Sequence, residues 1–412
     1  MRWILLLLAS LAHGAQAATV YTWPGPAPCH QALNDCLASA QSGDTVQIAG
    51  RQTIGAALSL NAAVSIVALP GGEAFFDVDA THFIQLPGTA PWTMNLRGLR
   101  FRKGTLTIRI NGTQPGTLAL EQLTMVQEAT GGTRQLTLLP QQTSSAVTTV
   151  LVRNSSFESG TQAGAFMSIL VFGSNTGLLQ LTVEDCRFFP ENVAMTPTTH
   201  SALTIASPAE FELVFRRNQV LRAHTLSRGF ASGVALNNNG GGTSRAFIHD
   251  NLLLLDGDAG AGGTGVLAQG PMDIRVLNNT IDFAYNSLAF GAQVSGRIDN
   301  NIFSQAFRWH DGPAPASNFQ MRGNLVFGML NPSNWPLPPG TVTSDPQLTN
   351  AGMLRPASPA INAGSNAARS EAGPGAQSAP EALDVLRQRR VAGAQIDIGA
   401  VEGERVFYAG WE

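Results

Sequence analysis

The sequence predicts an all-β fold, a right-handed parallel β-helix solenoid with an N-terminal helical cap and a C-terminal capping segment. The first observation is a hexapeptide that recurs nine times, with apolar first and last positions. Its copies start about 22 to 33 residues apart, the range of solenoid repeats. An asparagine column inside the repeat and a second family of short apolar runs are the other two observations. The copies are LRGLRF from Leu96, LEQLTM from Leu120, VRNSSF from Val152, VEDCRF from Val183, FRRNQV from Phe215, IHDNLL from Ile248, VLNNTI from Val276, IDNNIF from Ile298 and MRGNLV from Met321.

The fourth position of the hexapeptide predicts an interior ladder. Asparagine tolerates the left-handed backbone, and its amide both donates and accepts, so stacked copies can bond to each other and to the turn backbone. We expect Cys186 to be a buried small hydrophobe in the same column. The alternative is that asparagine and glycine mark unrelated surface turns. In order, the column reads Leu99, Leu123, Ser155, Cys186, Asn218, Asn251, Asn279, Asn301 and Asn324.

Short apolar runs precede the later hexapeptides, and a further run follows each asparagine. Each coil would therefore contain a strand, a turn, a strand, the asparagine turn, a strand and a long loop. This order resembles the pectin-lyase-like superfamily over about residues 30 to 340. The resemblance implies the architecture and leaves activity open, because that fold hosts lyases, hydrolases, esterases, adhesins and inert scaffolds. The preceding runs are SILVF from Ser168, SALTIA from Ser201, GVALN from Gly233, GVLAQ from Gly265 and SLAFG from Ser287.

The N-terminal region predicts export and a cap. Residues 1–17 combine a positive start, a short apolar run and the pattern Ala15-Gln16-Ala17, which is typical of a signal peptide. Residues 18–50 would form the N-terminal cap, with a helix from Gln31 to Ala40 over the open end of the first coil. Inside one helix, Cys29 and Cys36 would lie roughly 10 Å apart, too far for a disulfide. A bridge therefore requires Cys29 to precede the helix, and the oxidising compartment favours that bridge.

The solenoid is expected over residues 51–340, and a C-terminal capping region over residues 341–412. The motifs SDPQL from Ser344, LRPASPAINAG from Leu354 and DIGAVE from Asp397 resemble the tail of bacterial choice-of-anchor Q domain-containing proteins. The resemblance covers about residues 320 to 403 and implies an extracellular β-helix of unassigned activity. No sorting motif or apolar tail follows Glu402, so we expect secretion to the extracellular space or the periplasm.

Composition argues against several partners. The formal charge is −3 and charged residues make up 13% of the chain, so a basic stripe for nucleic acid is not expected. No segment of the mature chain reaches the 18 apolar residues of a membrane span. We expect a monomer that uses no cofactor. One candidate calcium loop is an exception to this expectation, because Asp256 and Asp258 lie among several glycines.

The long loops after the third strand of each coil predict a polysaccharide-binding wall. They lie at about residues 158–164, 189–199, 222–232 and 256–263. Counting from the ladder residues aligns His224 with Tyr285, and aligns Asp258 with Asn286 and Arg308, in coils about 4.8 Å apart. In this hypothesis an arginine holds a uronate carboxylate, His224 is a general base and an aromatic ring stacks on a sugar. The candidates are Arg222, Arg228 and Arg308 for the clamp, Tyr285 and Trp309 for stacking, and Asn286 for a polar contact.

Two functions of different classes compete. We expect a secreted, non-catalytic scaffold that contacts polysaccharide, because loops of an exposed solenoid are polar by default. The paired aspartates and Arg-x-Lys of polygalacturonases are missing, as are the esterase and alginate-epimerase patterns. The alternative is a polysaccharide lyase or glycoside hydrolase that acts on acidic polysaccharide through Arg222, His224, Asp258 and Arg308. Only the alternative predicts release of unsaturated or reducing sugar ends.

Overall fold

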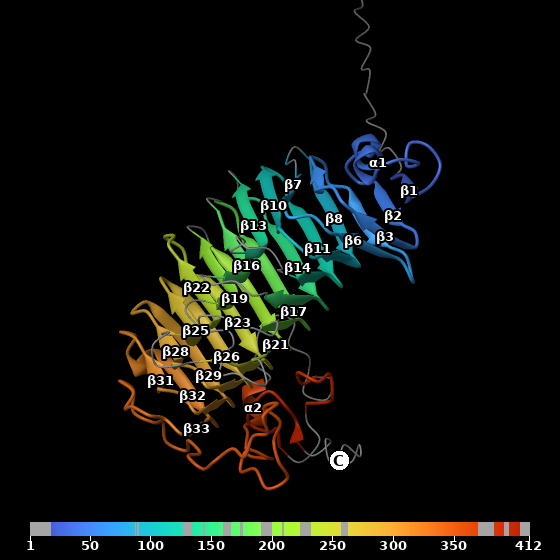
Figure 1. Ribbon diagram of the computed structural model, residues 1–412. Helices are drawn as coiled ribbons and strands as arrows, with labels where there is room; N and C mark the ends of the chain where they lie inside the picture. Colours follow the sequence, from blue (N-terminus) through green and yellow to red (C-terminus); the bar gives the residue numbers. More distant parts are fainter. Residues whose placement is uncertain are drawn as a thin grey trace, which may run out of the picture.

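The chain is a right-handed parallel β-helix, as the sequence predicted (Figure 1). The computed structural model describes residues 18–86, 88, 90–126, 134–142, 145–159, 166–173, 176–190, 200–207, 210–222, 232–256, 263–369, 383–390 and 395–403. Within them, successive coils stack three parallel sheets, which we call A, B and C. Each coil runs from sheet C to sheet A, through the asparagine turn to sheet B, and then through a loop back to sheet C.

Sheet A carries the first half of each hexapeptide and begins near the N-terminus. Its strands are β1 (Val20–Trp23), β2 (Thr45–Ile48), β5 (Ser65–Ala68), β8 (Trp92–Arg97), β11 (Gly116–Glu121), β14 (Thr148–Arg153), β17 (Leu179–Glu184), β20 (Phe211–Arg216), β23 (Ser244–His249), β26 (Met272–Leu277), β29 (Val294–Asp299) and β32 (Phe319–Arg322).

Sheets B and C complete each coil. Sheet B contains β3 (Arg51–Ile54), β6 (Glu73–Phe76), β9 (Leu99–Phe101), β12 (Thr124–Val126), β15 (Ser156–Ser159), β18 (Arg187–Pro190), β21 (Gln219–Val220), β24 (Leu252–Leu254), β27 (Thr280–Asp282), β30 (Ile302–Ser304) and β33 (Leu325–Phe327). Sheet C contains β4 (Ser59–Leu60), β7 (Thr81–Leu86), β10 (Thr105–Gly112), β13 (Arg134–Gln142), β16 (Phe166–Phe172), β19 (His200–Ser207), β22 (Ser232–Asn238), β25 (Thr264–Gln269), β28 (Asn286–Phe290) and β31 (Arg308–Asp311). The short helices are α1 (Leu33–Ser39), a 3₁₀ turn η1 (Ala316–Asn318) and α2 (Asn366–Arg369).

Strand alternation builds a continuous apolar core inside the coils. In β11, the side chains of Leu118 and Leu120 point inward and are buried, whereas Thr117 points outward and is exposed. Aromatic side chains also stack from coil to coil, as Phe157 does on Phe188 with ring centroids 4.9 Å apart. Because each coil buries its apolar side chains against the next one, the core extends along the whole solenoid.

The asparagine column forms a hydrogen-bonded ladder. Asn251 Nδ2 donates to Asn279 Oδ1 at 2.9 Å, Asn279 Nδ2 donates to Asn301 Oδ1 at 3.0 Å, and Asn301 Nδ2 donates to Asn324 Oδ1 at 3.0 Å. Asn218 makes the same bond to Asn251 at 3.1 Å. These five side chains are at most 4% exposed, so the ladder satisfies amides that would be costly to bury alone.

Cys186 ends the amide part of the column. Its backbone N–H donates to Asn218 Oδ1 at 3.0 Å, and its thiol donates to the carbonyl of Glu184 at 3.3 Å. Burial raises the pKa of this thiol to about 12. Cys186 is therefore a neutral, buried thiol and is not a reactive one.

The left-handed residue of the turn is not the ladder asparagine, which corrects our interpretation of the repeat. It is the third position of the hexapeptide in every copy, with φ between 52° and 70° from Gly98 to Gly323. The third position carries side chains as different as those of Gln122, Arg217 and Asn278. Asparagine at the fourth position is thus used for its two-sided amide, while the third residue bends the chain.

The N-terminal region is both cap and first coil. Helix α1 is shorter than predicted, and the disulfide joins Cys29, which precedes it, to Cys36 inside it, with Cα atoms 4.4 Å apart. Strands β1 and β2 already belong to sheet A, so the solenoid starts before residue 51, the predicted boundary. The predicted signal peptide, residues 1–17, lies outside the described residues.

The C-terminal region covers a side of the solenoid, where the sequence predicted an end cap. The described residues between 345 and 403 pack on the outer face of sheet B, beside the last coils (Figure 1). Val385 and Val401 pack on Leu252 and Leu254, while Leu354, Ala360 and Ile398 pack on Ile302 and Leu325. The reason is that β24 and β30 have buried side chains on both faces, which only a covering segment can shield. We call residues 345–369, 383–390 and 395–403 the flank segment.

The interior is closed at its C-terminal end by a tryptophan cluster. Trp335 stacks on His310 with ring centroids 3.4 Å apart, and its Nε1 donates to the carbonyl of Ala314 at 2.7 Å. Trp309 meets Trp335 edge to face at 5.5 Å. These rings cover the last coil, so the loop around residue 335 performs the capping that was predicted for residues 341–412.

Acid is expected to weaken the fold through His82. This side chain is fully buried between Phe76 and Phe101, and its Nδ1 accepts the N–H of Leu58 at 3.1 Å. Burial lowers its pKa to about 4. Since the unfolded side chain has a pKa of about 6.5, the stability contributed by neutral His82 is complete above that pH and is lost as the pH falls toward 4.

The loss amounts to at most about 3 kcal/mol. Denaturant titrations at pH 7, 5 and 4 measure it, and the variant His82→Gln, which keeps an acceptor but does not titrate, should show a shallower pH dependence. An equal pH dependence in the variant and the wild type would rule out this role.

Candidate functional site

The candidate site lies on the outer corner between sheets B and C in the last coils. Residues 283–285 join β27 to β28, and residues 305–307 join β30 to β31. Phe283 and Gln305 both have left-handed backbones, with φ of 57° and 54°, so the two corners repeat the same short turn. The register pairs Asn286 with Arg308, which agrees with the count from the ladder residues.

An aromatic pair forms the exposed part of this corner. Tyr285 and Phe307 are half-buried and stack with centroids 4.6 Å apart and planes 9° apart. Arg308 places its guanidinium 5.5 Å from the Phe307 centroid and forms an ion pair with Asp311 at 3.3 Å. Its side chain is 35% exposed, so a cation and an apolar ring face solvent side by side. We call Tyr285, Phe307 and Arg308 the aromatic-arginine patch.

Arg222 belongs to a neighbouring ion pair. It lies 3.7 Å from a carboxylate oxygen of Asp282, two coils further along sheet B, and 4.3 Å from the ring centroid of Phe283. Burial raises the pKa of Asp282 to about 6, although Arg222 and a hydrogen bond from Ser304 both act to lower it. Asp282 is therefore a carboxyl group that changes its charge near neutral pH.

Two residues that were predicted to contact sugar at the surface are buried. Trp309 is 4% exposed and points into the tryptophan cluster, because it follows the outward Arg308 and strand alternation turns it inward. Asn286 is 7% exposed and its buried Oδ1 has no hydrogen-bond partner among the described residues, so it does not face a ligand at the surface.

Several predicted residues cannot be placed. His224, Arg228 and Asp258 lie outside the described residues. Asp256 is described and is 7% exposed. Over the part of the chain that the structure describes, no group of three or more His, Cys, Asp or Glu side chains is arranged to hold a metal ion. Calcium at the loop of Asp256 and Asp258 thus remains a proposal.

Sequence reasoning missed two residues of the site. Phe283 is 43% exposed, and Asp311 pairs with Arg308 three positions before it. The spacing of opposite charges could have indicated Asp311, since residues three apart can approach at a strand end. No local signal marks Phe283, because its exposure follows from the left-handed turn.

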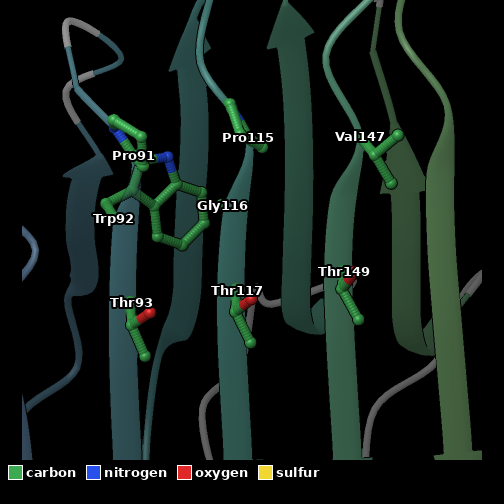
Figure 2. Close-up of a pocket in the computed structure, with 8 residues that line it drawn as sticks. All are labelled: Pro91, Trp92, Thr93, Pro115, Gly116, Thr117, Val147 and Thr149. Carbon is green, nitrogen blue, oxygen red and sulfur yellow. The ribbon is translucent and has the colours of Figure 1, made fainter.

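A shallow pocket of about 380 Å³ lies on a different face, at the start of β8, β11 and β14 on sheet A (Figure 2). The sequence analysis did not single it out. Figure 2 shows the Trp92 side chain extending toward Gly116, with three threonines aligned across the neighbouring strands. The lining residues are Pro91, Trp92, Thr93, Pro115, Gly116, Thr117, Val147 and Thr149.

Comparisons with known proteins give structural likenesses only. No family model and no curated protein sequence matches the chain. Among solved structures it is similar to pectate lyase Pel9A, with 14% identity, a TM-score of 0.49, and coverage of 95% of this chain and 98% of that one. It is also similar to the PL6 family alginate lyase AlyGC, with 12% identity and a TM-score of 0.35. That alignment covers 83% of this chain and about half, 56%, of the alginate lyase. The fold assignment stands on the three parallel sheets described above.

Among the described residues, no helix is both long and apolar enough to cross a membrane.

Proposed function

We propose that this protein is an exported, non-catalytic β-helix scaffold that contacts acidic polysaccharide through the aromatic-arginine patch. One observation carries the proposal, the stacking of Tyr285 on Phe307 with Arg308 beside them at the surface. A sugar ring can stack on such an aromatic face, and a guanidinium can bind a uronate carboxylate. The chain's formal charge is −3, so binding of a polyanion depends on a local cation such as Arg308.

The engagement of the arginines supports a non-catalytic role. Arg308 is paired with Asp311 and Arg222 with Asp282, so both candidate arginines that the structure describes already have a carboxylate partner. A lyase needs a cation that neutralises the substrate carboxylate while a base removes the adjacent proton. In this proposal the two arginines hold the surface together, and Arg308, the more exposed one, also meets the ligand.

Binding to polygalacturonate and alginate tests the proposal. We expect the variant Arg308→Glu to weaken binding at least about tenfold, because it replaces attraction by repulsion. Arg275→Glu is the matched control, since Arg275 lies 5.4 Å from the Phe247 ring on sheet A and away from the patch. Binding is measured by calorimetry with and without a chelator, and the chelator should change nothing. Equal weakening by both variants would show that only net charge matters.

The enzymatic alternative is favoured by one observation, the raised pKa of Asp282 beside Arg222. A carboxyl group with a pKa of about 6 can exchange a proton at neutral pH. Incubation with pectate or alginate distinguishes the two functions by the absorbance of unsaturated uronates and by the appearance of reducing ends. We expect neither product. Product release that disappears in Asp282→Asn would replace the scaffold by a lyase or hydrolase.

Membership of the choice-of-anchor Q family is a further part of the proposal. Its three motifs meet in the flank segment, where Ser358 Oγ donates to the carbonyl of Pro346 at 2.6 Å and the N–H of Ile398 donates to the carbonyl of Ala360 at 2.9 Å. Asp397 Oδ1 accepts the N–H of Asn362 at 2.7 Å. These contacts support a shared structural purpose for motifs that lie up to about fifty residues apart. Export and a monomeric state belong to the same proposal, and sedimentation of the secreted protein tests both.

A further inference from the structure

The pocket on sheet A has an apolar floor built around one glycine. A side chain at position 116 would overlap the Trp92 indole, so Gly116 lets the ring lie against β11 (Figure 2). Pro91, Pro115 and Val147 surround the ring, and Val147 is 37% exposed. Trp92 itself is only 6% exposed, so the apolar surface that a ligand can reach is provided mainly by the exposed Pro91, Pro115 and Val147. Such a surface matches the apolar C–H face of a pyranose ring.

A row of hydroxyl groups borders this floor. Thr93, Thr117 and Thr149 are paired in register across β8, β11 and β14, and all three are exposed. Neighbouring coils are about 4.8 Å apart, which is close to the length of one sugar unit in an extended glycan. A chain laid along the solenoid axis would therefore meet one threonine with each sugar.

Charge decides which sugar fits. None of the eight lining residues carries a charge, so a carboxylate would lose water without gaining a cation. Beyond Thr149 the same row continues with Gln180, which donates to Glu212 at 3.3 Å. A carboxylate at the end of the row disfavours a uronate chain and leaves an uncharged chain unaffected.

We propose that the Trp92 pocket is a binding site for uncharged sugar units of a polysaccharide, three coils long and separate from the aromatic-arginine patch. This inference rests on the proposed function, contact with polysaccharide, and adds a second contact site to it. It assigns neutral sugars to sheet A and acidic sugars to the corner of sheets B and C.

The test uses neutral β-1,4-linked hexasaccharides of glucose, mannose and xylose, with hexagalacturonate as the acidic probe. Calorimetry on the whole protein measures affinity, and tryptophan fluorescence reports contact with Trp92. We expect at least one neutral hexasaccharide to bind, and Thr117→Arg, in the middle of the row, to weaken it at least about tenfold. Thr117→Val removes only the hydroxyl and should weaken binding less. Thr182→Arg, a half-buried threonine on the outer face of β17 beyond the pocket, is the matched control and should bind like the wild type.

The two proposals fail separately. If no neutral hexasaccharide binds, or if Thr117→Arg binds as tightly as the wild type, the Trp92 site is overturned while hexagalacturonate binding can persist. If neutral sugars bind in a Thr117-dependent way but hexagalacturonate does not bind, the site stands and the acidic contact at Arg308 falls. If hexagalacturonate binds the wild type and its binding is lost in Thr117→Arg, the pocket binds acidic sugar. That result would also overturn the assignment of neutral sugars to this pocket.

Discussion

The variant Asn279→Ala is expected to lower the free energy of unfolding by about 3 to 6 kcal/mol. Asn279 Nδ2 donates to the carbonyls of Ile248 and Leu277 and to Asn301 Oδ1 at 2.9 to 3.0 Å. Its Oδ1 accepts both the backbone N–H and the side-chain amide of Asn251. Alanine leaves these groups buried without partners, and each orphaned group costs about 1 to 3 kcal/mol.

Urea titration followed by circular dichroism measures this loss. The exposed Asn61 provides the control, and Asn61→Ala should change the unfolding free energy by no more than about 0.5 kcal/mol. A loss below about 1 kcal/mol for Asn279→Ala would mean that water replaces the ladder amide.

The second large effect is expected at Arg390, which ties the flank segment to the solenoid. Arg390 is fully buried, and its Nε lies 3.5 Å from Asp250 Oδ1 while Asp250 Oδ2 bonds His249 Nδ1 at 2.8 Å. It also donates to the carbonyls of Asp397 and Gly399. Removing one partner of a buried ion pair costs about 3 to 5 kcal/mol, so Arg390→Ala should detach the flank segment.

Hydrogen exchange over residues 383–403, read by mass spectrometry, detects the detachment. Exchange there should rise while the strands of sheets A and C stay protected, since each coil is held by its neighbours. Arg389→Ala is the matched control, because Arg389 is exposed. The double variant Asp250→Asn with Arg390→Met should recover part of the loss by removing both charges. Unchanged exchange in Arg390→Ala would show that apolar packing alone holds the segment.

The candidate site was only partly predictable. The pairing of Asn286 with Arg308 followed from counting, because both positions lie at a constant distance from a ladder asparagine. The direction of Trp309 did not, since a shift of one residue along a strand moves a side chain from the surface to the core. The Trp92 pocket escaped notice because its floor depends on a ring that crosses to the glycine of the next coil, 24 positions along the chain.

The repeat alone determined the parallel β-helix and the column of asparagines, because each coil is stabilised by neighbours that carry the same pattern a fixed number of residues away. The position of the flank segment was decided only by tertiary structure. Its contacts join residues far apart, such as the N–H of Ala400 and the hydroxyl of Thr280, which are 120 positions apart and share no period. Periodicity encodes contacts between adjacent coils, whereas shape and charge decide where a non-repeating segment packs.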